Sequence, residues 1–416
     1  MRTFFALTLF VYLAPACHAE DWATLHGSGL QAVQQNDFPV AAEVFARCRA
    51  LAQTKLQRAV SDNDLGVVLH RLGREAEARG YLEKALESWK EFSDLGAHYA
   101  ETASALALVD RMLGDYAASE AVLKSGLELS GISGDLRIHL LLLTGDLLRE
   151  LGRYGEARVL LKQAEAIPPA SPRQQVDAIA ALAELDRDTQ NWDASIAEWT
   201  RAIELAREKK DEFGEAGCIR GLGQTWLDRG NLARAEPLLR GALALYRAKR
   251  RPDDAEIAAV QASLGQLYLA EDKTGLAEES LRRALDGQER AFGPTHPQLA
   301  IVLEALADTV ARRNQLELAR EYMGRAETIM VGRFGENSLM TAGVFANWGS
   351  IEQRANQPDR AAAKYEKALS VLRTMPGDLD AFRLSVMKGY AQVLRAAHHK
   401  REAEVILAEA QGFRSK

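Results

Sequence analysis

The chain has 416 residues, of which 47% are hydrophobic and 26% charged, and its formal net charge is −6. A single hydrophobic core stops growing at about 250–300 residues, so a chain of this length either divides into domains or is built from repeats. The composition is close to that of ordinary soluble proteins, which excludes a fibrous or largely disordered chain. The negative net charge argues against a dedicated nucleic-acid-binding protein.

The first nineteen residues have the layout of a secretory signal. Arg2 gives a positive start, residues 4–13 form an apolar run, and residues 14–19 are mostly small. The apolar run is about half as long as a membrane-spanning helix. We therefore expect residues 1–19 to be a signal peptide and the mature chain to be exported, to a bacterial periplasm or out of the cell. A second interpretation places cleavage before Cys17, at a site that resembles those of bacterial lipoproteins, and would leave the protein lipid-anchored.

An internal repeat is the strongest signal in the rest of the chain. A small residue is followed four positions later by a large apolar residue, and three positions after that by another small one. Ten such triplets occur: Ala41-Phe45-Cys48, Ala78-Leu82-Ala85, Ser119-Leu123-Gly126, Ala157-Leu161-Ala164, Ser195-Trp199-Ala202, Ala235-Leu239-Ala242, Ala277-Leu281-Ala284, Ala319-Met323-Ala326, Ala361-Tyr365-Ala368 and Ala403-Leu407-Ala410. Their first members are 37, 41, 38, 38, 40, 42, 42, 42 and 42 residues apart. A period of this length predicts a stacked repeat architecture.

Each unit also has an upstream half with helical spacing, as in Leu65-Gly66 followed by Leu69. Between the halves of four units stands a glycine able to take the left-handed conformation that ends a helix: Gly73, Gly114, Gly152 and Gly230. Each unit is therefore predicted to be a helical hairpin that buries its apolar face only against its neighbours. Cys48 and Cys218 fall five units apart, which predicts two buried free thiols rather than a disulfide.

These residues resemble the tetratricopeptide repeat family. The 42-residue spacing of the last units, with Leu281–Leu285 followed by Phe292–Pro297, is similar to the longer repeats of kinesin light chains and their bacterial relatives. The resemblance implies an all-α, right-handed superhelical solenoid of about ten antiparallel helix-turn-helix repeats, continuous over residues 20–416. It also implies binding of other polypeptides. The sequence departs from the family pattern at Thr144, Ser119 and Ser195.

No catalytic or cofactor-binding pattern accompanies the repeats. The chain lacks the metal-protease, phosphate-loop and nucleophile-elbow motifs, and no strand pattern could present a dinucleotide loop. Gly221 and Gly223 fall within a predicted helix, where close helix packing is the favoured interpretation. His398 and His399 fall in a turn without further ligands. The six tryptophans could suggest a ligand cage, but Trp199, Trp226 and Trp348 fall on packing positions, which favours core filling. We therefore expect a protein that is not an enzyme and has no cofactor and no metal.

One row of residues suggests a binding surface. The position after the third apolar residue of each first helix lies, by the family resemblance, on the concave groove, and it holds His70, Arg111, Arg149 and Arg187 in units two to five. Arginine can bind a carboxylate through two parallel hydrogen bonds, so this ladder suits an acidic or C-terminal peptide segment. The alternative is that the arginines pair with acids on their own helices, Asp146 with Arg149 and Glu184 with Arg187.

The sequence thus predicts an exported, non-enzymatic scaffold or adaptor that binds a protein or peptide partner in its groove. The alternative is a structural, self-associating or lipid-anchored assembly protein. Neither interpretation includes nucleic-acid binding or a transmembrane span.

Overall fold

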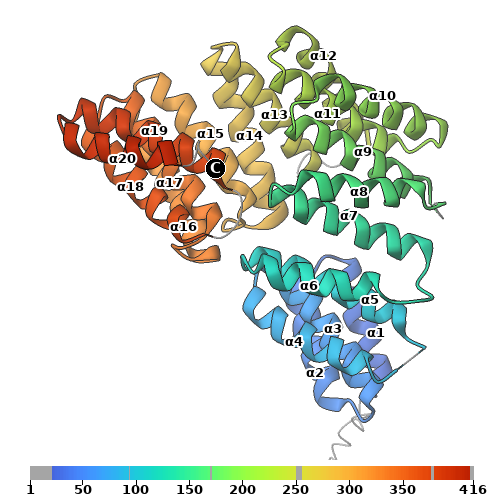
Figure 1. The fold of residues 1–416 in the computed structure, drawn as a ribbon. Helices are drawn as coiled ribbons and strands as arrows, with labels where there is room; N and C mark the ends of the chain where they lie inside the picture. Colours follow the sequence, from blue (N-terminus) through green and yellow to red (C-terminus); the bar gives the residue numbers. More distant parts are fainter. Residues whose placement is uncertain (1–20, 93, 169–170, 250–254, 376–378, 413–416) are drawn as a thin grey trace, which may run out of the picture. The chain divides into compact units, whose positions relative to one another are not determined.

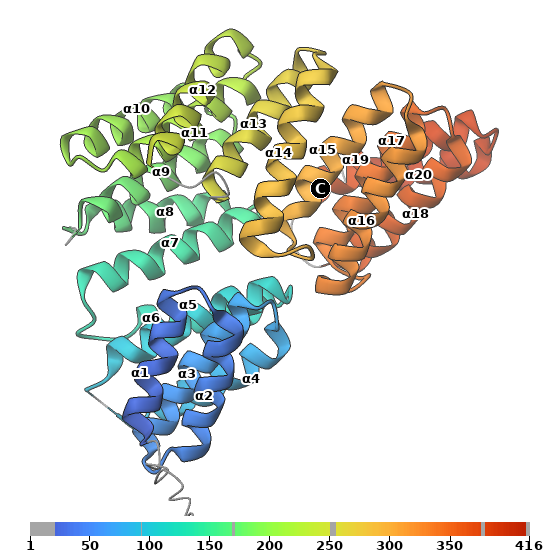
Figure 2. The ribbon, with the colours of Figure 1, turned by 180° about the vertical axis from the view of Figure 1, so that it is seen from behind.

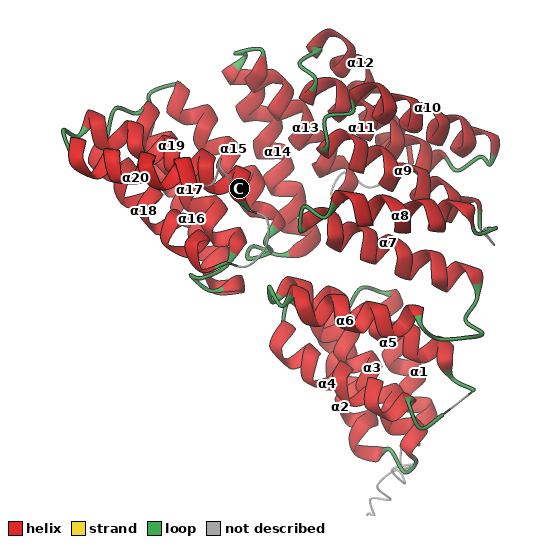
Figure 3. Cartoon of the chain, viewed as in Figure 1, coloured by secondary structure: helices red, strands yellow, loops and turns green. Residues whose placement is uncertain are grey.

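The computed structural model describes residues 21–412 apart from residues 93, 169–170, 250–254 and 376–378. The predicted signal peptide and Cys17 therefore lie outside the described residues. Within them every regular element is an α-helix, and no strand occurs (Figure 3). No described helix is long and apolar enough to cross a membrane. The chain divides into two compact units, Met1–Glu91 and Phe92–Lys416.

The described part of the chain forms twenty helices, which pack pairwise as ten consecutive antiparallel hairpins (Figure 1). The first unit holds α1 (Trp22–Gln34), α2 (Phe38–Leu51), α3 (Lys55–Arg71) and α4 (Glu75–Trp89). The second unit begins with α5 (Gly96–Met112), α6 (Tyr116–Leu127), α7 (Gly134–Glu150), α8 (Tyr154–Ala166), α9 (Pro172–Asp188), α10 (Trp192–Glu208), α11 (Glu212–Asp228) and α12 (Leu232–Lys249). It continues with α13 (Ala255–Ala270), α14 (Thr274–Phe292), α15 (Gln298–Arg312), α16 (Leu316–Phe334), α17 (Leu339–Arg354), α18 (Pro358–Thr374), α19 (Asp380–Ala396) and α20 (Lys400–Gly412). The predicted all-α repeat architecture is confirmed; the right-handed sense of its superhelix stays a prediction.

The triplets that reveal the repeat form the core of the second helix of each hairpin. In α14, for example, Ala277, Leu281 and Ala284 are fully buried. The small residues allow close approach of the neighbouring axes, and the large residue fills the space between them. Leu407 in α20 is only half-buried, because no further hairpin follows it within the described chain.

The residues that depart from the family pattern have local hydrogen-bonding partners. Ser119 and Ser195 take the place of the usual alanine, and each donates its hydroxyl to a carbonyl of the first helix of its own hairpin, Ala107 and Ala183, at 2.8 Å. Thr144 donates to the carbonyl of Leu140 one turn earlier, at 2.7 Å. A buried hydroxyl costs little when its hydrogen bond is made, so these substitutions leave the hairpins intact.

Every hairpin turns at one residue in the left-handed conformation. Glycine occupies this position at Gly73, Gly114, Gly152 and Gly230, as predicted, with φ between 73° and 83°. In the other six hairpins the residue is not glycine: Asn36, Gln190, Asp272, Asn314, Asn356 and His398. The ten left-handed residues keep the same spacing as the triplets. His398 is therefore the residue that ends α19, a structural position rather than a ligand position.

The two helices of a hairpin have different neighbours in the second unit. Consecutive first helices, such as α7 and α9 or α9 and α11, contact each other as well as the second helices between them. Consecutive second helices of the described chain do not pack together in this way. A row of helices curves toward the side on which its members touch, so the first helices line the inner face of this unit. Figures 1 and 2 show the hairpins of the unit following one another.

Both predicted buried cysteines are buried, Cys48 in α2 and Cys218 in α11. Burial raises the pKa of the Cys218 thiol to about 12. A thiol with so high a pKa is almost entirely protonated near neutral pH and is a poor nucleophile. The structure therefore gives Cys218 a packing role.

Candidate functional site

The inner face of the second unit carries a continuous set of charged side chains near the C-terminal ends of four first helices. We call this set the charged row: Arg111, Asp146, Arg149, Glu150, Glu184, Arg187, Asp188 and Asp228. Helices α5, α7, α9 and α11 supply these residues, and the contacts between those helices bring them together. His70 belongs to the other compact unit and is described separately.

Each arginine of the predicted ladder is already engaged by carboxylates. The Arg111 guanidinium lies 3.4 Å from Glu150 of the next first helix. Arg149 lies 2.5 Å from Asp188 and 3.2 Å from Glu184, both on the next first helix, and 3.6 Å from Asp146 on its own helix.

The last arginine of the ladder repeats the pattern. Arg187 is 3.5 Å from Asp188, its neighbour in sequence, and 3.6 Å from Asp228 of the next first helix. The charged row is therefore mainly a set of ion pairs between hairpins. Of the two pairings predicted within single helices, Asp146 with Arg149 is observed, whereas Glu184 contacts Arg149 of the preceding hairpin.

The charged row contains three arginines and five carboxylates, so it is not the cationic ladder that the sequence suggested. The arginine side chains are 19% to 27% exposed and the carboxylate side chains 26% to 38%, so the acids are the more accessible groups. Burial, with Glu184 as the second cause, raises the pKa of Asp146 to about 6. Burial also raises the pKa of Glu150. The arginines do not fully compensate the negative charge of this face.

His70 is held by one strong local contact within the first unit. Its Nδ1 lies 2.7 Å from Oε2 of Glu75, a carboxylate that is almost completely buried at the start of α4. The contact joins the end of α3 to the start of α4 across the hairpin turn. A structural role in joining α3 to α4 therefore explains the position of His70 without a bound partner.

The carboxylates that follow the groove position were not predicted from the sequence. Glu150 follows Arg149, Asp188 follows Arg187, and Asp228 follows Leu227, which holds the same position in the next hairpin. These regularly spaced acidic residues were visible in the sequence. Their ion pairs with arginines of the preceding hairpin could not be predicted from the sequence, because these pairs depend on the offset between neighbouring hairpins.

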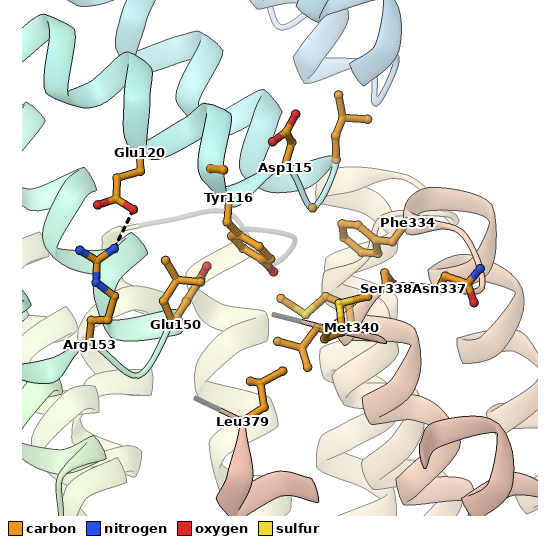
Figure 4. A pocket seen from close by; sticks show the side chains of 16 residues that line it. Asp115, Tyr116, Glu120, Glu150, Arg153, Phe334, Asn337, Ser338, Met340 and Leu379 are labelled. Carbon is orange, nitrogen blue, oxygen red and sulfur yellow. Dashed lines mark hydrogen bonds and ion pairs between the residues drawn. The ribbon is translucent and has the colours of Figure 1, made fainter. Parts of the chain in front are cut away.

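A cavity of about 550 Å³ opens beside Glu150 (Figure 4). Tyr116, Phe334, Met340 and Leu379 contribute to its mainly apolar lining, which comes from the turns after α5 and α7 and the turns before α17 and α19. Three carboxylates stand at its edge, those of Asp115, Glu120 and Glu150.

Among the described residues that line this cavity, the one basic residue is already paired. Arg153 donates to Glu120 at 2.7 Å and pairs with Glu156 as well. The cavity edge therefore has the same negative character as the charged row. No local sequence pattern predicts this cavity, because its two sides are about 200 residues apart in the chain.

The other candidate features have structural explanations. Alanine at Gly221 would place its Cβ 2.5 Å from Cη2 of Trp199, and at Gly223 2.9 Å from Leu239, so both glycines serve close helix packing, as predicted. His399 contacts Glu402 at 3.0 Å. No group of three or more metal-ligating side chains occurs in the part of the chain that the structure describes.

Of the three tryptophans, only Trp199 is buried in the core. Trp226 is half-buried, and the guanidiniums of Arg229 and Arg234 lie 5.4 and 4.4 Å from its ring centroid. Trp348 is half-buried, with Nζ of Lys364 3.4 Å from its ring centroid. The core-filling interpretation therefore holds fully for Trp199 and only partly for the other two.

Comparisons with known proteins agree with this architecture. Models of the tetratricopeptide repeat match residues 57–131, 216–250 and 256–330. No curated protein matches the chain in sequence. Among solved structures, a Rap protein complexed with Competence and Sporulation Factor is similar over 86% of this chain and 98% of its own, with 12% identity and a TM-score of 0.57.

Two further structures are similar over shorter parts of the chain. A tetratricopeptide repeat protein from Parabacteroides merdae covers 72% of this chain and 98% of its own, with 15% identity and a TM-score of 0.50. BtubC (BKLC) from P. vanneervenii covers 54% of this chain and 91% of its own, with 23% identity and a TM-score of 0.47. At these identities the similarity to the Rap protein and to the Parabacteroides merdae protein establishes the fold alone.

Proposed function

Because the chain is a tetratricopeptide repeat protein, we propose that it is a non-enzymatic scaffold that binds a protein or peptide along the first helices of the unit Phe92–Lys416. The observation that carries the proposal is the charged row, which four successive first helices present on one face. A stacked array offers an extended surface of this kind, whose length suits an extended polypeptide segment. A Rap protein of similar fold was solved in complex with Competence and Sporulation Factor. This complex supports the proposal that an array of this kind can bind a partner.

The charge of the row favours a partner segment with basic side chains. An acidic or C-terminal carboxylate segment, which the sequence predicts, would have to displace Glu150, Glu184, Asp188 and Asp228 from the arginines. A basic segment meets the more exposed groups and relieves the excess of negative charge. On this proposal the arginines position the carboxylates, and the carboxylates contact the partner.

The charge preference can be tested by selecting peptides from a random displayed library on the chain of residues 20–416. We expect the selected peptides to carry net positive charge. Their affinity should fall about tenfold, or about 1.4 kcal/mol, in the variant Glu184→Gln/Asp188→Asn, because two accessible partner charges are lost. Titration calorimetry with one selected peptide measures the change.

The matched control is Glu204→Gln/Glu404→Gln, which removes two exposed carboxylates from the second helices α10 and α20 and should leave the affinity unchanged. Selection of acidic peptides that lose binding in Arg149→Ala/Arg187→Ala would contradict the basic segment and support the acidic one. Absence of any selected peptide that binds the inner face would contradict the scaffold proposal itself.

We also propose that the protein is exported to the periplasm or secreted, on the pattern of its first nineteen residues. Cleavage after Ala19 leaves 416 − 19 = 397 residues. We expect the intact mass of protein recovered from outside the cytoplasm of an expressing bacterium to correspond to those 397 residues. A mass that begins at a lipid-modified Cys17 would support the anchored alternative, and an uncleaved chain confined to the cytoplasm would contradict export.

A further inference from the structure

A second pocket, of about 430 Å³, lies where α13 packs between α12 and α14. Arg247 lines it from the end of α12, Ile257 and Gln261 from α13, and Arg283, Asp286 and Arg290 from α14. None of these residues belongs to the charged row or to the cavity of Figure 4. The pocket is therefore independent of the proposed peptide surface.

Two of the basic side chains that line the pocket have no partner among the described residues. Arg247 and Arg290 form no ion pair or hydrogen bond with any described residue. Arg283 pairs on its own helix with Glu279 at 2.6 Å. Among the described lining residues, Asp286 is the carboxylate that stands beside the unpaired guanidiniums of Arg247 and Arg290. This contrasts with the charged row, where every guanidinium is engaged.

Gln261 supplies an independent sign of a ligand. The residue is only 4% exposed, yet it lines the pocket, and its side-chain amide makes no hydrogen bond within the described chain. Neither amide atom of Gln261 is among the side-chain atoms that are closed off from solvent without a partner, so a molecule in the pocket can reach this amide. The neighbouring Ile257 is buried and gives the pocket an apolar wall. Together these groups offer charge, a neutral donor and apolar contact.

The position of Arg290 alone would have a simpler explanation. It stands in the last turn of α14, where a basic side chain interacts favourably with the helix dipole. The dipole does not account for the side-chain amide of Gln261, which makes no hydrogen bond within the described chain. A ligand that carries an oxyanion would give Arg247, Arg290 and the Gln261 amide a common partner.

We propose that this pocket binds a small organic anion through a carboxylate or phosphate group. The guanidiniums of Arg247 and Arg290 would hold the oxyanion, since arginine's planar fork matches the oxygens of both groups. The Gln261 amide donates to the same group or to its neighbour, and the carbon skeleton of the ligand lies against Ile257. The site does not require the peptide-binding role and can exist without it.

Calorimetric titration of the chain of residues 20–416 with inorganic phosphate and with citrate, at constant ionic strength, tests the proposal. We expect saturable binding of one anion per chain, with an affinity at least tenfold lower in Arg247→Gln/Arg290→Gln. The matched control is Arg360→Gln/Arg401→Gln, which removes two exposed arginines of α18 and α20 and should bind as the unchanged protein does. The phosphate and citrate arms distinguish a phosphoryl ligand from a carboxylate one.

Gln261→Met separates binding from stability, because methionine fills nearly the same volume without an amide. We expect this variant to stay folded and to bind the preferred anion several-fold more weakly. The proposal is wrong if neither anion binds saturably in the millimolar range, or if both arginine variants lose binding equally, which would indicate nonspecific attraction. Unchanged binding in Gln261→Met would remove the amide from the site and overturn the arrangement proposed here.

Discussion

Replacing Arg320 with alanine is expected to lower the free energy of unfolding by about 3 kcal/mol at neutral pH. Arg320 in α16 donates through Nε and one terminal nitrogen to both oxygens of Glu352 in α17, at 2.8 and 2.9 Å. The Glu352 side chain is only 4% exposed. Removing one partner of a buried pair leaves the other charge uncompensated, which costs about 3–5 kcal/mol. We expect the lower end of this energy range, because the Arg320 side chain is itself 19% exposed. Urea unfolding followed by far-ultraviolet circular dichroism measures the change.

The effect should depend on pH in a definite direction. Burial tends to raise the pKa of Glu352, but the hydrogen bonds from Arg320 and Trp348 outweigh it, and the pKa lies below its ordinary value. In the unchanged protein this group therefore stabilises the fold at neutral pH, and the contribution is lost as the pH falls through its lowered pKa. In Arg320→Ala burial dominates and raises the pKa. The cost of the substitution should therefore be larger at pH 7 than at pH 5.

Two variants control for this interpretation. Arg283→Ala breaks an exposed pair with Glu279 and should change the free energy of unfolding by less than about 0.5 kcal/mol. Arg320→Met/Glu352→Met replaces the buried pair by apolar groups and should cost much less than Arg320→Ala. If Arg320→Ala has the stability of the unchanged protein at both pH values, the pair does not hold the two hairpins together.

Replacing Gly221 with alanine is expected to destabilise the fold by about 1–3 kcal/mol. The added Cβ would lie 2.5 Å from Cη2 of Trp199, well inside ordinary contact distance. Trp199 is 3% exposed and belongs to the core of the hairpins around α10 and α11, so a shift of its ring would disturb the packing of its neighbours. Either the ring or the helix must shift. Chemical unfolding of the two proteins measures the loss.

Replacing Gly241 with alanine is expected to stabilise the fold instead of destabilising it. Gly241 lies within α12, and a Cβ there meets no atom within 4 Å. Alanine should stabilise this helix by about 0.5–1 kcal/mol, because it restricts the unfolded chain and favours the helix. In the background Trp199→Phe, where the smaller ring leaves room, Gly221→Ala should cost less than in the unchanged protein. Equal effects at Gly221 and Gly241 would show that helix propensity, not packing, decides the outcome.

Local sequence determined the fold of this protein. The triplets, such as Ala277-Leu281-Ala284, repeat side-chain volume at helical spacing, and volume at fixed spacing along one helix is a local property. The hairpin turns were predictable where glycine marks them, as at Gly152. They were not predictable at Gln190 or His398, which adopt the same left-handed conformation without glycine. There the stacking of neighbouring hairpins imposes the turn against the local preference of the residue.

The binding chemistry was decided by the tertiary structure. The sequence placed Arg149 and Arg187 on one face, but the sign of that face depends on carboxylates such as Asp188, contributed across the boundary between hairpins. The pocket at Gln261 likewise needs three helices to assemble. The positions of buried residues and the repeat length follow from the spacing of apolar residues along one helix. The ion pairs depend instead on the offset between neighbouring helices, and no single repeat encodes this offset. The sequence by itself therefore determined what this protein is built from, and only the packing of its hairpins decided what its surfaces can bind.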